Sequence, residues 1–140
     1  MAGLFVDTWG WLALRDKGEH RHKDAVAAFD KSMAAGPIVT TDYVLDETFT
    51  LLFRRLPVHK ARESMESLLA ATSEGAVSLA PIHAARFRDA ARLRLKFRDK
   101  PEISFTDFTS MAVMEELGLK RILTEDRHFA QVGMSFELLP

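Results

Sequence analysis

Four acidic residues lie at or near the ends of short apolar runs that read as β-strands. These residues are Asp7, Glu47, Asp107 and Asp126. If the apolar runs are neighbouring strands of one parallel sheet, the four carboxylates meet at the carboxyl edge of that sheet. Carboxylates at such close range repel one another strongly, so the cluster is tolerable only with cations between them. The pattern therefore predicts a divalent-metal site and suggests phosphodiester chemistry.

The oxygen ligands of this cluster indicate which metal it would take. Carboxylate oxygens select Mg²⁺ or Mn²⁺, which keep several water molecules and bind substrate phosphate directly. Such a cation lowers the pKa of a bound water and neutralises the charge that develops on a phosphate under attack. The reaction needs no Lys, Ser or Cys nucleophile, and the chain contains no cysteine. We therefore expect a hydrolase that depends on Mg²⁺ or Mn²⁺.

Glu47 is the acid that a purely structural role explains least well. It shares a predicted helix face with Val44 and Leu51, so we expect it to point inward along an apolar stripe. A carboxylate costs free energy to bury unless a partner compensates its charge. The other three acids have simple alternative roles as helix caps or as charges at helix N-termini.

The composition bounds the class of protein. With 140 residues, 47% of them hydrophobic and 28% charged, we expect one globular domain over residues 1–140 rather than a disordered chain. No apolar stretch is long enough to span a membrane, and no Lys or Arg precedes the apolar N-terminal run as in a signal peptide. We expect a cytoplasmic protein without a membrane partner, in agreement with the absence of cysteine.

Short apolar runs alternate with longer helical patterns, which is typical of βα units around a parallel sheet. The predicted strands are Leu4–Val6, Ile38–Thr40, Val77–Leu79, Ile122–Thr124 and Ser135–Leu138. The predicted helices are Trp9–Arg15, Glu19–Ala35, Asp42–Arg55, one from Pro57 to Glu74, a basic one from Pro81 to Lys100, and one between Ser104 and Gly118. We expect an α/β fold with a central parallel sheet of four to five strands.

Positive charge is concentrated in one segment, although the net charge of −1 argues against a protein that binds nucleic acid with its whole surface. Residues 86–100 contain seven Lys or Arg and two Asp. Phosphate contacts from this helix would position RNA without reading its sequence, and the candidates are Arg88, Arg92, Arg94 and Arg98. A solvated helix face is the alternative. A second possible basic strip consists of Arg54, Arg55, His59, Lys60 and Arg62.

Aromatic and histidine residues offer further interpretations. Trp9, Trp11 and Phe49 are able to stack on bases, but aromatic side chains at helical spacing more often belong to a core or an interface. His20 and His22 have no third ligand in view, so we expect surface residues rather than a zinc site.

Four segments distributed over nearly the whole chain carry a recognisable pattern. They are Phe5–Thr8, Thr41–Glu47, Ser104–Asp107 and Leu123–Phe129. Together they resemble the PIN domain, and more narrowly the VapC-type ribonuclease toxins and their stand-alone relatives. The resemblance implies a three-layer α/β/α sandwich and a Mg²⁺- or Mn²⁺-dependent endoribonuclease that cuts RNA. It also implies a homodimer and a small antitoxin whose tail enters the acidic cleft, as in a type II toxin–antitoxin pair.

By position, the acidic quartet of that family falls on the four acids named above, as catalytic and metal-binding residues. Thr124 matches a hydroxyl residue often found near the metal, and is a possible accessory residue. One departure is His128, where relatives often carry a further acid two residues after Asp126. The resemblance therefore implies that a second metal position is weak, or filled only with substrate present. His128 is either a proton donor to the leaving oxygen or a bystander.

The expected reaction is in-line attack of an activated water, oriented by Asp107 and Asp126, that leaves a 5′-phosphate and a 3′-hydroxyl. A catalytically silent PIN module that only binds RNA or a partner protein is the alternative, and the complete quartet argues against it. A phosphatase with an Asp nucleophile needs a second Asp where Trp9 stands, and a nucleotide-binding module needs a glycine-rich loop after the first strand. The sequence names neither the RNA nor the antitoxin.

Overall fold

A computed structural model describes residues 3–140 of the chain, which fold around one five-stranded parallel sheet. The strands are β1 (Leu4–Val6), β2 (Ile38–Thr41), β3 (Ser78–Ala80), β4 (Arg121–Leu123) and β5 (Glu137–Leu139). Their order in the sheet is β3-β2-β1-β4-β5. The predicted parallel sheet is confirmed. The single domain expected over residues 1–140 stays a prediction, since residues 1 and 2 lie outside the described part.

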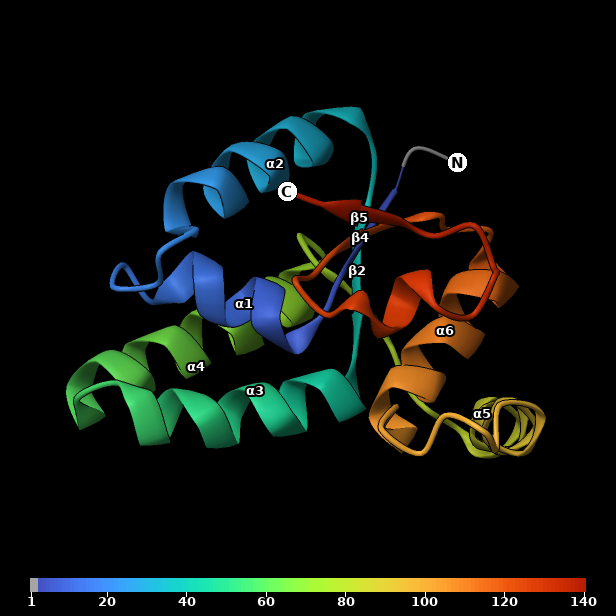
Figure 1. Ribbon diagram of the computed structural model, residues 1–140. Helices are drawn as coiled ribbons and strands as arrows, with labels where there is room; N and C mark the ends of the chain where they lie inside the picture. The colour runs from blue at the N-terminus through green and yellow to red at the C-terminus, as the bar shows by residue number, and fades with distance from the viewer. Residues whose placement is uncertain (1–2) are drawn as a thin grey trace.

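Six α-helices flank this sheet within residues 3–140. They are α1 (Thr8–Arg15), α2 (His22–Ala35), α3 (Asp42–Arg55), α4 (Val58–Glu74), α5 (Ala84–Lys96) and α6 (Phe105–Leu117). Helices α1 to α4 lie to one side of the sheet and α5 and α6 to the other, which gives the expected three layers (Figure 1). Between 3 and 140 no helix combines the length and the hydropathy that a membrane crossing requires.

The boundaries of α5 differ from the prediction. The helix spans Ala84–Lys96 and so is shorter at both ends than the helix predicted from Pro81 to Lys100. His83 is its N-cap, and the imidazole of His83 accepts a hydrogen bond from the backbone N–H of Arg86 at 3.3 Å. After Lys96 the chain turns, and the backbone N–H of Lys100 bonds to the carbonyl of Phe97 at 2.9 Å.

The centre of the sheet explains why β1 reads as a continuous apolar run. Leu4, Phe5 and Val6 are each fully buried, because helices cover both faces of a central parallel strand. A buried hydroxyl then ties α1 to the strand ends. Thr40 accepts from the indole N–H of Trp11 at 3.1 Å and donates to the carbonyl oxygen of Val6 at 3.0 Å. Trp11 is thus a core residue and not a platform for bases.

Helix α1 approaches the sheet so closely that only glycine fits at one position. A Cβ atom at Gly10 would lie 2.6 Å from the carbonyl oxygen of Leu123 and 2.8 Å from a methyl group of Val6. Val6 and Leu123 are the last residues of β1 and β4, and they are paired in the sheet. The close approach therefore fixes α1 directly over the two strand ends that lead to Asp7 and Thr124.

We predict that Gly10→Ala lowers the free energy of unfolding by about 1–3 kcal/mol, because backbone and core atoms must shift to admit the methyl group. The higher helix propensity of alanine offsets only part of that loss. Urea unfolding followed by circular dichroism measures the change. Gly18→Ala is the matched control, since its Cβ would meet only the carboxylate oxygen of the half-buried Asp16, at 3.2 Å, which is the end of a movable side chain. Equal stability of both variants would contradict the prediction.

Candidate functional site

The acidic residues gather where the strand order of the sheet reverses. From β1 the chain continues to β2 and β3 on one side, whereas β4 and β5 lie on the other. In open α/β sheets, functional groups collect beyond the carboxyl ends of the strands at such a point. Asp7 directly follows β1 and Thr124 directly follows β4, and the register pairs the residues before them, Val6 and Leu123.

The hydroxyl of Thr124 links two of the acids. It donates to Asp7 Oδ2 at 2.9 Å and accepts from the backbone N–H of Asp126 at 3.0 Å. Both Asp7 and Thr124 are buried. Thr124 was expected near the site, and its position fixes the carboxylate of Asp7 relative to the loop that carries Asp126.

Asp107 reaches the same place from the opposite layer, in the first turn of α6. Ser104 is the N-cap of this helix, and its hydroxyl accepts from the backbone N–H of Asp107 at 3.0 Å. The helix dipole favours a negative charge at this position. Ser104 therefore fixes the start of α6 and the position of Asp107 in its first turn.

His128 stands between two of the carboxylates. Its Nδ1 atom lies 3.0 Å from Asp126 Oδ1 and 3.3 Å from Asp107 Oδ2. One ligand atom from each of these three residues lies within 4.8 Å of the others, which suits a single divalent cation. The bystander role considered for His128 is therefore the weaker interpretation of its position.

Electrostatics at the site favour a cation. Burial, and next the charge of Asp107, raise the pKa of Asp7 from 3.8 to about 7. Burial, and next the charge of Asp126, also raise the pKa of Asp107, while His128 opposes the shift. The hydroxyl of Thr8, buried beside Asp7, finds no hydrogen-bond partner within the described part of the protein. A bound cation with its waters would compensate the charges and satisfy that hydroxyl.

The position of Glu47 corrects one prediction. The prediction that Glu47 points inward is wrong, because its side chain is exposed. The buried face of α3 is formed by Val44, Leu45, Thr48 and Leu52, and Glu47 lies beside this face rather than on it. It nevertheless lines the same hollow, of about 290 Å³, as the other three acids. All four acids thus surround one space, with Glu47 at its solvent side.

The hollow contains residues that were not assigned to it from the sequence. Besides the four acids and His128, it is lined by Thr8, Trp9, Leu12, Leu51, Arg55, Glu102 and Ser104. Arg55 is its only Arg or Lys among the described residues, and had been assigned only to a second basic strip. Glu102 was not considered at all. Its place just before the helix that carries Asp107 was the available signal.

Arg94 is held by the fold, which corrects the expectation that it is free to bind phosphate. Its guanidinium donates to the backbone carbonyls of Ile103, Phe97 and Lys100 at 2.6, 2.7 and 2.8 Å. It also lies 4.6 Å from the centre of the Phe108 ring. Arg94 thereby fixes the loop between α5 and α6, which leads to the candidate site.

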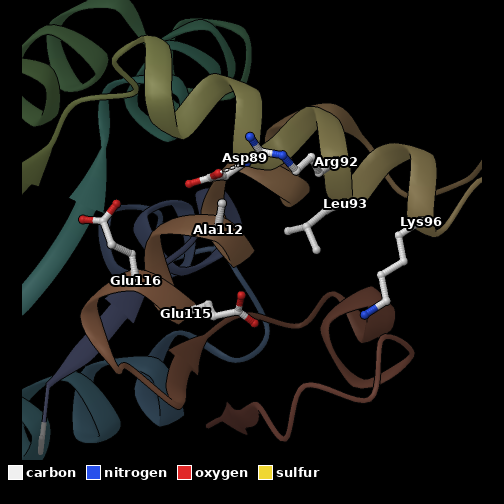
Figure 2. Close-up of a pocket in the computed structure, with 7 residues that line it drawn as sticks. All are labelled: Asp89, Arg92, Leu93, Lys96, Ala112, Glu115 and Glu116. Atoms are coloured by element: carbon white, nitrogen blue, oxygen red, sulfur yellow. Dashed lines mark hydrogen bonds and ion pairs between the residues drawn. The ribbon is translucent and has the colours of Figure 1, made fainter.

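The other three arginines proposed to contact phosphate are exposed. Arg88 and Arg98 face solvent, and Arg98 donates to the carbonyl of Leu95 at 3.3 Å. Arg92 is paired with Asp89, as Figure 2 shows, so part of its charge is already compensated. These three residues remain available for phosphate contacts.

A second hollow, of about 440 Å³, lies between α5 and α6 and away from the four acids (Figure 2). It is lined by Asp89, Arg92, Leu93, Lys96, Ala112, Glu115 and Glu116. Charges of both signs are spread along its walls. The residues lining it include none of the acids whose pKa is raised, so we place the chemistry at the strand ends.

Comparison with known families agrees with this geometry. The PIN domain matches residues 4–134 of the sequence. The chain belongs to the PIN domain family. A curated relative from Mycobacterium tuberculosis, the 23S rRNA-specific endonuclease VapC20, is 33% identical to this PIN domain over 132 residues. The alignment covers 93% of this chain and 94% of that protein.

Solved structures give the same result. The crystal structure of M. tuberculosis VapC20, described as a sarcin–ricin loop cleaving toxin, superposes with a TM-score of 0.76 at 32% identity, over 93% of this chain and 95% of that one. VapBC2 from Rickettsia felis bound to promoter DNA has a TM-score of 0.76 at 11% identity over 99% of both chains. FitAcB from Neisseria gonorrhoeae has a TM-score of 0.63 at 15% identity over 98% and 96%. The last two comparisons support the fold alone.

We predict that the metal-free PIN domain loses stability as the pH rises from about 4 to about 7. Asp7 has a pKa of about 7 in the folded state against 3.8 as its ordinary value, so the folded protein binds the proton more tightly. Asp7→Asn removes this penalty and should raise the free energy of unfolding at pH 8 in EDTA by up to about 4 kcal/mol. At pH 4 the difference should largely vanish.

Urea unfolding at several pH values measures this difference, with Asp46→Asn as a control that alters an exposed acid of α3. If the stability of wild type relative to Asp7→Asn increased with pH, the assigned direction of the shift would be incorrect.

Proposed function

We propose that this PIN domain is a divalent-metal-dependent endoribonuclease that hydrolyses RNA phosphodiester bonds, with Mg²⁺ or Mn²⁺ as the cation. The observation that carries the proposal is that Asp7, Glu47, Asp107 and Asp126 surround one hollow, where two of them are buried. The relative VapC20 is named as an endonuclease of 23S rRNA, which supports RNA as the substrate. We therefore also propose that the protein is the toxin of a type II toxin–antitoxin pair.

Each acid has a distinct part in this mechanism. Asp107 and Asp126 would hold the cation and orient the attacking water, since their carboxylates converge from two layers of the fold. Asp7 would add negative charge from the floor of the hollow, in an orientation set by Thr124. Glu47 would act from the solvent side, where the RNA backbone enters. When bound, the cation supplies positive charge that stabilises the phosphate under attack and acidifies the water.

The expected reaction is an in-line attack that leaves a 5′-phosphate and a 3′-hydroxyl. Arg55, at the rim of the hollow, is placed to neutralise an RNA phosphate next to the cleaved bond. Arg88, Arg92 and Arg98 would contact phosphates further along the strand without reading sequence. Arg94 is left out because the fold occupies its guanidinium.

The proposal also includes a partner protein of this chain. VapBC2 and FitAcB are structural neighbours that cover 99% and 98% of this chain, and VapBC2 is described as bound to a fragment of promoter DNA. We propose a small antitoxin protein as the partner of this chain, whose tail occupies the acidic hollow. The homodimer and the cytoplasmic location stay predictions from the sequence.

We predict that Asp107→Asn and Glu47→Gln each lower RNA cleavage by about a hundredfold or more, because each removes a carboxylate that would hold the cation opposite the reacting phosphate. Asp46→Asn is the matched control, as it changes an exposed acid next to Glu47 on the same helix. The measurement is cleavage of a 23S rRNA fragment with Mg²⁺ or Mn²⁺, with the new ends mapped and tested for a 5′-phosphate.

A catalytically silent module that only binds RNA or a partner predicts a different result. It would leave the RNA intact at every metal concentration and would gain no thermal stability from Mn²⁺. Variants that cut as fast as wild type would equally exclude the assigned roles of the acids.

We predict that Arg88→Ala combined with Arg98→Ala weakens RNA binding in EDTA. In a plot of the logarithm of the binding constant against the logarithm of the salt concentration, the slope should become shallower by about one unit per lost phosphate contact. Fluorescence anisotropy over a range of salt concentrations measures both quantities. Lys31→Ala is the control, because it removes an exposed charge from α2 on the other side of the sheet. A slope equal to that of wild type would show that RNA avoids this face.

A further inference from the structure

One group at the acidic hollow has a nitrogen rather than an oxygen donor. Nδ1 of His128 approaches Asp126 Oδ1 to 3.0 Å and Asp107 Oδ2 to 3.3 Å. These three residues form one of only two groups of side chains among residues 3–140 that are spaced to hold a metal ion. The donor set available on this side of the hollow is thus two carboxylates and one imidazole.

The imidazole is held in place by its surroundings. His128 is the second residue of the short 3₁₀ helix η1 (Arg127–Ala130), and its backbone N–H donates to Asp126 Oδ1 at 2.8 Å. The next residue, Phe129, is buried and packs edge-on against Phe136 at 6.2 Å. The side chain of His128 is 26% exposed. A ring fixed in this way loses little entropy when it binds a metal.

The donor set discriminates between the two cations considered for the nuclease. Mg²⁺ is a hard ion that keeps its waters and takes oxygen ligands, whereas Mn²⁺, a first-row transition metal, accepts an imidazole nitrogen more readily than Mg²⁺ does. We propose that His128 is a ligand of the metal, together with Asp107 and Asp126, and that the site therefore binds Mn²⁺ in preference to Mg²⁺. This inference rests on the proposed nuclease function and specifies the metal that the site uses.

The second group spaced to hold a metal provides an internal control. It consists of Glu19, His20 and Glu125, and His20 is 70% exposed at the molecular surface. Its Nδ1 lies 2.6 Å from Glu19, while its Nε2 lies 3.7 Å from Glu125. This histidine lacks the anchoring that fixes His128, so we expect it to contribute nothing to tight metal binding.

The test is direct observation of the ligand on bound Mn²⁺, in the full chain without RNA. Electron spin echo modulation of Mn²⁺ bound to wild type should show coupling to a histidine nitrogen. The coupling should be absent in His128→Ala and His128→Asp and retained in His20→Ala. Circular dichroism confirms that each variant is folded before metal is added.

Affinities measured by calorimetry complete the test. His128→Ala should weaken Mn²⁺ binding about tenfold or more and change Mg²⁺ binding by less than about threefold. His128→Asp should bind Mg²⁺ more tightly than wild type, because a third carboxylate replaces the imidazole. Absence of nitrogen coupling in wild type, or equal losses for both metals in His128→Ala, would overturn the inference. Cleavage of RNA by the same wild-type protein would then leave the proposed nuclease function standing.

Discussion

Repulsion between buried carboxylates is the constraint on which the site of this PIN domain depends. Asp7 at the end of β1 and Asp107 in the first turn of α6 are both buried. The charge of Asp107 raises the pKa of Asp7, and the charge of Asp126 raises the pKa of Asp107. Left to themselves, flexible segments would move such groups apart. The parallel sheet prevents this, because its register fixes the ends of β1 and β4 next to each other. The fold thus holds the carboxylates so close together that they repel one another, and a bound cation would offset this repulsion.

Three of the four acids were predictable because topology alone determines where they lie. Asp7 and Asp126 follow strands whose apolar runs are plain in the sequence, and Asp107 lies in the first turn of a helix with a clear cap at Ser104. Strand ends and helix starts are local features, and the rule that parallel strands share a carboxyl edge brings them together. No knowledge of side-chain packing was needed.

The features that were not predicted depend on the rotation of a helix about its axis and on the path of a loop. Glu47 lies beside the buried stripe of α3. A small rotation about the helix axis is enough to turn a side chain from the core to solvent, and Glu47 is exposed. Arg94 appeared to be one charge in a basic strip, but three carbonyls of the following loop surround its guanidinium. That loop also brings Glu102 to the hollow. Its path cannot be predicted from the sequence, because a loop has no periodic pattern of apolar residues.

The hydrogen bonds of Thr124 join residues from opposite ends of the chain. Thr124 binds Asp7, which is 117 positions earlier in the sequence. During synthesis the first strand and Asp7 emerge early, but Thr124 follows only after six helices and three further strands. A ribosome that translates this chain therefore carries no assembled metal site on the growing polypeptide until Thr124 and Asp126 have been added. The order of the elements thus delays the appearance of the complete acidic cluster until long after Asp7 has been made.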